Sequence, residues 1–184
     1  MKRMATLVVI ACLGVAPLLS AQAQDAKLKP LPSPSQAVLD SWNDIGRKLI
    51  AMAEDFPEDK YDFKPTPAQR SFAEGLLHAA GANYFFTNPA IGQKPPGEED
   101  PKREQYKTKA DVVAYVKKSF ADGAAAIKAK GDSGLSQVVV LGKDQTRIID
   151  LAYGLIEHDG EHYGQLVVYY RLAGLVPPES RPKK

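Results

Sequence analysis

Four long amphipathic segments constrain the fold of this 184-residue chain more than any other feature. Over residues 35 to 56, apolar side chains recur every three or four positions, which places them on one face of a helix. Comparable segments follow over residues 71 to 86, 108 to 130 and about 144 to 173. The one strand-like run, residues 138 to 141, is short. The pattern therefore predicts an all-α protein, a four-helix bundle.

Capping signals mark where these helices begin and end. Asn88-Pro89 is expected to stop the second helix, and residues 88 to 106 to form a polar connection. The third helix should break at Gly131 to Gly134, and the fourth should end at Gly174, before Pro177-Pro178. The first three helices each begin with a capping box, in which a hydroxyl residue precedes an acid or amide by three positions: Ser33 to Gln36, Ser71 to Glu74 and Thr108 to Asp111.

The first residues are typical of an export signal. A short basic start, Met1 to Arg3, precedes a nearly apolar run from Ala5 to Leu19, and Ala21-Gln22-Ala23 offers a cleavage site. The run has 15 residues, whereas a membrane-spanning helix needs roughly 20, so a retained anchor is the weaker alternative. Cleavage before Cys12, as in a lipoprotein, is weaker still because it would leave an apolar stretch on the mature chain.

The expected organisation follows from this signal. We expect a signal peptide over residues 1–23, cleaved near Ala23, and a polar lead-in over residues 24–34. The bundle should occupy residues 35–180, with a basic tail over residues 181–184. The protein is therefore expected to be exported, either periplasmic or secreted, with no stable membrane insertion after cleavage.

The composition excludes several function classes. Cys12 is the only cysteine and lies in the signal, so the mature chain can form neither a disulfide nor a cysteine metal site. Lys2 and Arg3 are also lost on cleavage, which leaves 22 basic residues of the 24 in the chain against 22 acidic ones. A chain with balanced charge and no basic tract lacks the electrostatic signature of a nucleic-acid binder.

All three histidines fall on two of the predicted helices. His158 and His162 are four residues apart on the fourth helix, where their side chains lie one above the other on the same face. Such a pair is a common helical device for chelating a divalent ion. His78 lies on the second helix near the small residue Gly75. The pair belongs to two heptad series that we expect to face the interior: Ile148, Leu155, His162 and Tyr169, and Leu151, His158, Gln165 and Leu172.

These residues alone leave two interpretations open. A buried histidine is more often a hydrogen-bonded core residue than a ligand, although two on one helical face make the metal interpretation about as strong. His78 adds to a metal site only if the second and fourth helices are neighbours, which composition cannot show. Three neutral imidazoles would suit zinc, nickel, copper or iron and would leave coordination positions open.

Two stretches resemble the DinB/YfiT-like family. The first is Lys64-Pro65-Thr66-Pro67 with Arg70-Ser71-Phe72 and Leu76-Leu77-His78. The second is Leu155 with His158, followed by His162-Tyr163-Gly164-Gln165-Leu166 and then Tyr170-Arg171, Gly174 and Val176-Pro177-Pro178. The resemblance covers residues 35 to 180. It implies a DinB-like four-helix bundle that holds one metal ion on His78, His158 and His162.

Three polar residues near the histidines have two interpretations each. His158 to His162 spells H-x-x-E-H, but the distant third ligand of the proteases with that motif is missing, so we reject a protease. Glu161 could still be a general base, or a solvated charge at the edge of the helix. Gln165 could line the site or bond to another helix, and Glu74 could orient His78 or simply complete the capping box.

The sequence therefore predicts a metal-dependent enzyme, a hydrolase or a transferase acting on a small molecule, with Glu161 as the candidate catalytic base. The expected cofactor is one divalent transition metal ion: zinc, nickel or iron. Some members of the resembled family activate a low-molecular-weight thiol, but such thiols are mainly cytoplasmic. The alternative is a non-catalytic periplasmic bundle that binds a metal or another ligand. We expect the partner to be a small-molecule substrate, and we expect no binding to nucleic acid. A homodimer remains an open alternative.

Overall fold

The computed structural model describes residues 29–92 and 101–182. The bundle lies in the unit that begins at Pro32. The predicted signal peptide and residues 24–28 of the predicted lead-in lie outside the described residues. Within the described part of the chain, no helix is both long and apolar enough to cross a membrane.

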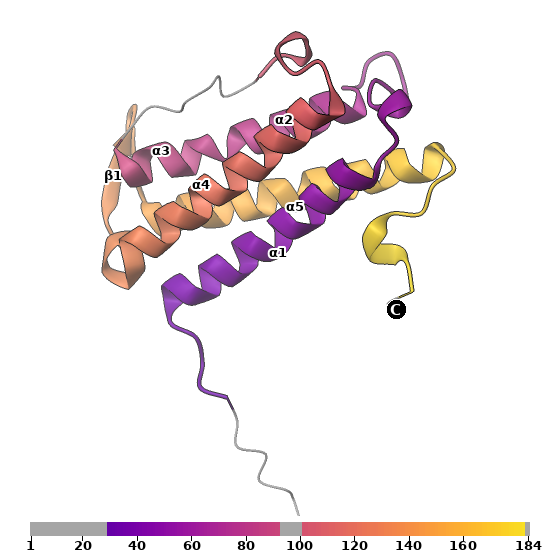
Figure 1. The fold of residues 1–184 in the computed structure, drawn as a ribbon. Coiled ribbons are helices and arrows are strands. Elements are labelled where there is room, and N and C mark those ends of the chain that lie inside the picture. The colour runs from indigo at the N-terminus through magenta and orange to yellow at the C-terminus, as the bar shows by residue number, and fades with distance from the viewer. Residues whose placement is uncertain (1–28, 93–100, 183–184) are drawn as a thin grey trace, which may run out of the picture. The chain divides into compact units, whose positions relative to one another are not determined.

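Four helical segments form the bundle (Figure 1). They are α1 (Pro34–Asp55), α2 (Phe72–Ala82) continued by α3 (Tyr84–Ile91), α4 (Lys109–Leu135) and α5 (Ile148–Leu172). α1 packs against α4 and α5, and α2 with α3 packs against the same two helices. α1 and α5 run in one direction, whereas α2–α3 and α4 run in the other (Figure 1). The predicted all-α bundle is thus confirmed, and the second and fourth predicted helices are neighbours.

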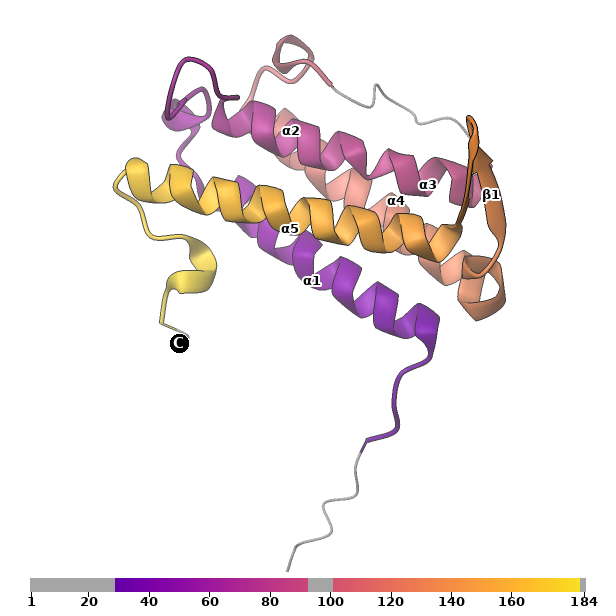
Figure 2. The same cartoon turned by 180° about the vertical axis from the view of Figure 1, so that it is seen from behind.

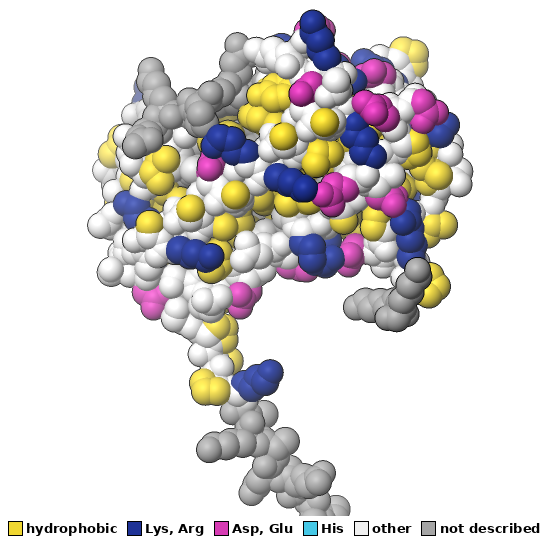
Figure 3. Space-filling model, in the orientation of Figure 1, with side chains coloured by type: hydrophobic (Ala, Val, Ile, Leu, Met, Phe, Trp, Pro, Cys, Tyr) yellow, Lys and Arg dark blue, Asp and Glu magenta, His cyan; other side chains and the backbone are white. Residues whose placement is uncertain are grey.

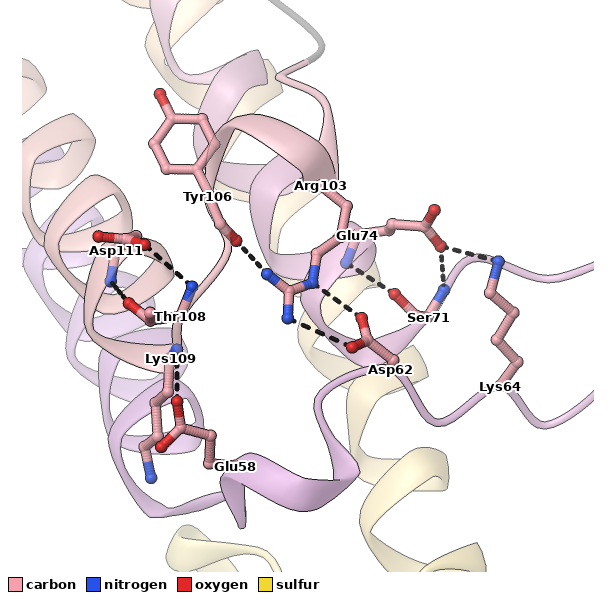
Figure 4. Close-up of polar contacts among 10 residues, drawn as sticks. All are labelled: Glu58, Asp62, Lys64, Ser71, Glu74, Arg103, Tyr106, Thr108, Lys109 and Asp111. Carbon is pink, nitrogen blue, oxygen red and sulfur yellow. Dashed lines mark hydrogen bonds and ion pairs between the residues drawn. The ribbon is translucent and has the colours of Figure 1, made fainter.

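The N-terminal caps are largely as predicted. Ser71 and Glu74 form a complete capping box, as do Thr108 and Asp111 (Figure 4). At α1, the Ser33 hydroxyl accepts the Gln36 backbone N–H, with Pro34 at the first helical position. The Gln36 side chain donates instead to the Asp40 carboxylate at 2.7 Å. The predicted box at α1 is therefore wrong in its second half, because the Gln36 side chain is directed along the helix to Asp40 and not back to the Ser33 N–H.

The second helical segment is longer than predicted. Asn83 interrupts the hydrogen-bond pattern between α2 and α3, but its backbone stays helical. α3 continues through Pro89 to Ile91, so the expected stop at Asn88-Pro89 is wrong. Proline removes only the N–H that would donate to residue 85, and the bond that spans the proline, from Gly92 N–H to the Asn88 carbonyl, forms at 2.8 Å. Burial of Ala90 beyond the proline favours this extra turn.

The predicted start of the last helix is corrected by a short hairpin. Strand β1 (Val138–Leu141) is where the sequence placed its strand-like run, and it pairs antiparallel with β2 (Asp144–Arg147). Gly142, at φ +62°, makes the tight connection between them. Residues 144–147 are thus a strand instead of the first turn of α5. The expected break before the hairpin is confirmed at Gly131, which leaves helical geometry within α4.

Glycines let α1 and α4 cross closely. A Cβ atom on Gly123 would lie 2.1 Å from the Trp42 ring, and one on Gly46 would lie 2.7 Å from the Phe120 ring. Trp42 is fully buried and donates its indole N–H to the Phe120 carbonyl at 2.9 Å. The Phe86 ring packs on Trp42 with centroids 5.2 Å apart. This end of the core therefore depends on the absence of side chains at two positions.

Polar contacts tie the loop after α1 to the segment before α4 (Figure 4). Arg103 pairs with Asp62 at 2.8 Å and also donates to the Tyr106 carbonyl. Glu58 accepts the backbone N–H of Lys109 at 3.1 Å. These contacts hold the loop that leads into α2, and α2 carries the first of the three histidines.

The face formed by α1 and α4 carries interspersed basic and acidic side chains (Figure 3). No histidine is visible on it. Seen from behind, α5 lies in front (Figure 2), and it carries two of the three histidines.

We predict that Gly123→Ala destabilises the protein by about 1–3 kcal/mol, because the added methyl group overlaps the Trp42 ring and overpacks the core. Denaturant unfolding of both proteins measures the difference. Gly154→Ala is the matched control, since a Cβ there meets nothing within 4 Å. That variant should be more stable by about 0.5–1 kcal/mol, because alanine favours a helix over glycine. Equal effects of the two substitutions would contradict the close α1–α4 packing.

Candidate metal centre

The buried face of α5 differs from the predicted one. For the series that contains His162, the prediction is confirmed at Ile148, His162 and Tyr169, which are buried. The second series is wrong at Gln165 and Leu172, which are exposed, whereas Leu151 and His158 are half-buried. The buried partners lie one position further along the helix: Ala152, Asp159 and Leu166. His158 consequently lies at the edge of the buried face, where its side chain is 28% exposed.

The three histidines nevertheless converge. His78 on α2 faces His162 and His158 on α5, with ring centroids 4.8 and 5.3 Å away respectively. The two rings on α5 have their Nε2 atoms 3.2 Å apart. One nitrogen from each histidine lies within 4.8 Å of the other two. The structure thus brings together all three residues that the sequence singled out.

Close packing of α2 on α5 produces this convergence. A Cβ atom on Gly75, one turn before His78, would lie 3.3 Å from a methyl carbon of Leu166. Leu166 itself is one turn beyond His162 and is buried. Gly75 therefore permits the close approach of α5 to α2.

The nitrogen positions fit a metal ion. Two imidazole nitrogens bound to one tetrahedral zinc ion at ~2.05 Å are about 3.3 Å apart, and His158 and His162 already have that separation. Closing the remaining distances from at most 4.8 Å requires shifts of no more than about 1.5 Å for the same zinc geometry. The three histidines could hold one ion. Among the residues that the structure describes, no fourth histidine or carboxylate joins the group.

The surroundings of His162 keep this histidine in the neutral form that can bind a cation. Burial lowers the pKa of His162 to about 4, and the neighbouring His158 and His78 act in the same direction. His162 is therefore neutral near pH 7, which is the form that ligates a metal. The Gln165 side chain next to it is the one neighbour that opposes this lowering of the pKa.

Asp159 is a site residue that the sequence reasoning missed. Its side chain is fully buried, and neither carboxylate oxygen has a hydrogen-bond partner among the described residues. Burial raises its pKa to about 6. The nearest basic atom is Nδ1 of His158, 3.9 Å from Oδ1. An acid between two histidines in an H-x-x-x-H spacing was the available signal, but the heptad chosen for α5 placed it off the buried face.

The other candidate residues have different surroundings. Glu161 is exposed, and its role as a base stays a prediction. Glu74 accepts the Ser71 N–H and pairs with Lys64 at 3.1 Å, so the capping interpretation of this residue is confirmed. Gln165 lines a cavity beside His162.

This cavity, which we call the His162 cavity, has a volume of about 470 Å³. The residues that give it its polar character come from the loop before α2 and from α5: Gln69, Arg70, His162, Gln165 and Tyr169. A cavity of this size falls within the range of small-molecule sites. The arrangement therefore combines a set of three imidazoles with a space beside one of them.

Comparisons with known proteins agree with this architecture. A DinB-like protein from Bacillus cereus ATCC 10987 has a TM-score of 0.63 and 18% identity, covering 78% of this chain and 95% of its own. A DinB-like protein from Bacillus subtilis, YjoA, has a TM-score of 0.62 and 17% identity, covering 80% and 99%. A search of curated proteins gave no match. Residues 43–166 match the model of the DinB superfamily, and the chain therefore belongs to that superfamily.

Proposed function

We propose that this protein is a metal-dependent enzyme, a hydrolase or transferase of a small molecule, with one divalent ion on His78, His158 and His162. The carrying observation is the combination of three convergent imidazoles with the His162 cavity beside them. A purely structural metal site would be closed by a fourth protein ligand. An adjoining cavity supports a site at which substrate meets the ion.

The ion would supply Lewis acidity, which polarises a bound oxygen or sulfur atom and lowers its pKa. The chain's own residues have separate roles in this proposal. The three imidazoles hold the ion, and low pKa of His162 keeps one of them neutral. Gln165 and Arg70 face the adjoining cavity, where they can orient a substrate. Glu161 stays the candidate base, and zinc, nickel and iron are the candidate ions.

The second candidate is a non-catalytic bundle that binds a metal or another ligand. This candidate is favoured because Glu161 is exposed and no carboxylate lines the His162 cavity. Turnover assays of the metal-loaded protein on ester, amide and thiol-transfer substrates separate the two candidates. Activity that vanishes with the metal supports the enzyme, and metal binding without any turnover supports the second candidate.

We predict that the protein purified without a histidine tag contains close to one equivalent of a transition metal. His78→Ala, His158→Ala and His162→Ala should each reduce the content to near zero, because two imidazoles hold a labile ion weakly. Glu161→Gln is the control and should keep the wild-type content, since it removes no ligand. Elemental analysis measures all five proteins. Full occupancy in His78→Ala would refute the three-histidine site.

Removing the metal should also lower the melting temperature. Binding stabilises the native state by about 2.7 kcal/mol when the free ion exceeds its Kd a hundredfold. A chelator should therefore reduce the melting temperature of the wild type while leaving that of His162→Ala unchanged.

We further propose that Asp159 orients His158 by accepting a hydrogen bond from its Nδ1–H group, so that Nε2 faces the ion. Imidazole ligands commonly donate their second N–H to a carboxylate, and loss of such a partner weakens metal binding about 10–100-fold. His158 Nδ1 and Asp159 Oδ1 lie 3.9 Å apart, so this hydrogen bond requires the two groups to approach by about 1 Å when the ion binds. Asp159→Asn should weaken metal affinity by that factor, measured by competition with a chromophoric chelator. Unchanged affinity would refute the positioning role.

The same substitution should have the opposite effect on the metal-free protein. Because burial raises the Asp159 pKa to about 6, the folded state binds this proton more tightly than the unfolded state. The stability that Asp159 contributes to the wild type is therefore lost as the pH rises from about 4 to 6. Relative to it, Asp159→Asn should gain on the order of 3 kcal/mol between pH 4 and pH 7. The exposed control Glu157→Gln should show no such trend; a flat difference for Asp159→Asn would contradict its buried ionisation.

We also propose that the protein is exported and that residues 1–23 are removed near Ala23, as the sequence predicts. Expression of the full chain with separation of compartments, followed by intact mass measurement, tests this. We expect a periplasmic or secreted product that begins close to Gln24. Recovery of the uncleaved chain in the cytoplasm would contradict it.

A further inference from the structure

The His162 cavity has a distinctive charge distribution. Its lining contains one cation, Arg70, and the amide side chains of Gln69 and Gln165, but no carboxylate. Arg70 is exposed on the wall of the cavity and has no ion-pair partner in the described parts of the chain. A free guanidinium beside two amide donors is suited to a ligand that carries negative charge.

The backbone at Arg70 is held in place from two sides. The Tyr169 hydroxyl donates to the Arg70 carbonyl at 2.8 Å, and Tyr169 is buried on α5. The next residue, Ser71, is the N-cap of α2 and is fixed by its capping box with Glu74. The backbone of Arg70 is therefore fixed between the two helices that carry the histidines. This limits the positions that its side chain can reach.

Glu74, the acidic residue nearest to Arg70 in the sequence, is already engaged. Glu74 lies one turn into α2, but its carboxylate accepts the Ser71 N–H and pairs with Lys64. Hydrogen bonding to that backbone N–H is the main cause of the lowered Glu74 pKa. Burial lowers the pKa of His162 and raises that of Tyr169, and the positive charge of Arg70 acts to lower both, which places Arg70 within electrostatic reach of the site.

We propose that the His162 cavity binds the anionic group of a small molecule, a carboxylate or a phosphate, and that Arg70 is the residue that selects for this charge. The planar guanidinium presents paired N–H donors that match two oxygens of either group. Gln69 and Gln165 add neutral donors beside it. This inference deepens the proposed function, on which it rests for the reaction, by naming the class of substrate.

The test measures anion binding to metal-free and zinc-loaded protein separately. Backbone amide signals in ¹⁵N NMR spectra are followed during titration with acetate, inorganic phosphate or neutral acetamide at constant ionic strength. We expect both anions to shift signals around residues 69–75 and 162–169, and acetamide to have little effect. Preference for acetate or phosphate identifies which anionic group the substrate carries. Acetamide binding as tight as acetate binding would overturn the proposal.

Variants separate recognition by Arg70 from general attraction of anions. Arg70→Gln should weaken anion binding at least tenfold, and Arg70→Lys should fall between it and the wild type, because lysine keeps the charge but loses the paired donors. Arg171→Gln, at an exposed position of α5 outside the cavity lining, removes the same charge and should bind as the wild type does. Wild-type anion affinity in Arg70→Gln would overturn the assignment.

The two forms of the protein keep this result distinct from the proposed function. Anion binding by the metal-free protein that depends on Arg70 supports the inference even if zinc fails to bind, an outcome that would refute only the metal site. Zinc binding with no Arg70-dependent anion binding in either form would refute only the inference.

Discussion

The close contact between α2 and α5 is the constraint on which the site depends. At Gly75 the two helices approach so nearly that a single added Cβ would press against Leu166. One turn along, the same approach places the His78 ring 4.8 Å from that of His162. It also sets Arg70, just before α2, against Tyr169 of α5. One helix contact therefore positions the imidazoles and the cavity wall together.

Local features of the fold could be predicted from the sequence, because a cap or a helix break depends on a few neighbouring residues. The capping boxes at Ser71 and Thr108 and the break at Gly131 are examples. The pairing of α2 with α5 depends on packing between residues far apart in the chain, so the spacing of the histidines could not show it. The sequence indicated this pairing only through its resemblance to the DinB/YfiT-like family. The match of residues 43–166 to the DinB superfamily supports that resemblance.

The buried face of α5 was misjudged for a physical reason. Leu172, which was predicted to face the core, is exposed and Leu151 is only partly buried, whereas the buried face contains the small Ala152 and the ionisable Asp159. A carboxylate in a helical core conflicts with the ordinary preference of buried positions for apolar groups. Such conflicts between local rule and observed position are expected at functional sites. Asp159 therefore lies beside the three histidines. Burying its negative charge costs free energy, and a cation bound nearby would offset that cost.

The central claim is that three imidazole nitrogens bind one ion. X-ray absorption at the zinc edge of the purified, tag-free protein loaded with one equivalent of zinc measures this most directly. We expect three nitrogen scatterers at ~2.0–2.1 Å, with the outer-shell pattern of imidazole rings, and a remaining light-atom ligand from solvent. A first shell made mainly of solvent oxygens, or one with two imidazoles or fewer, would contradict it.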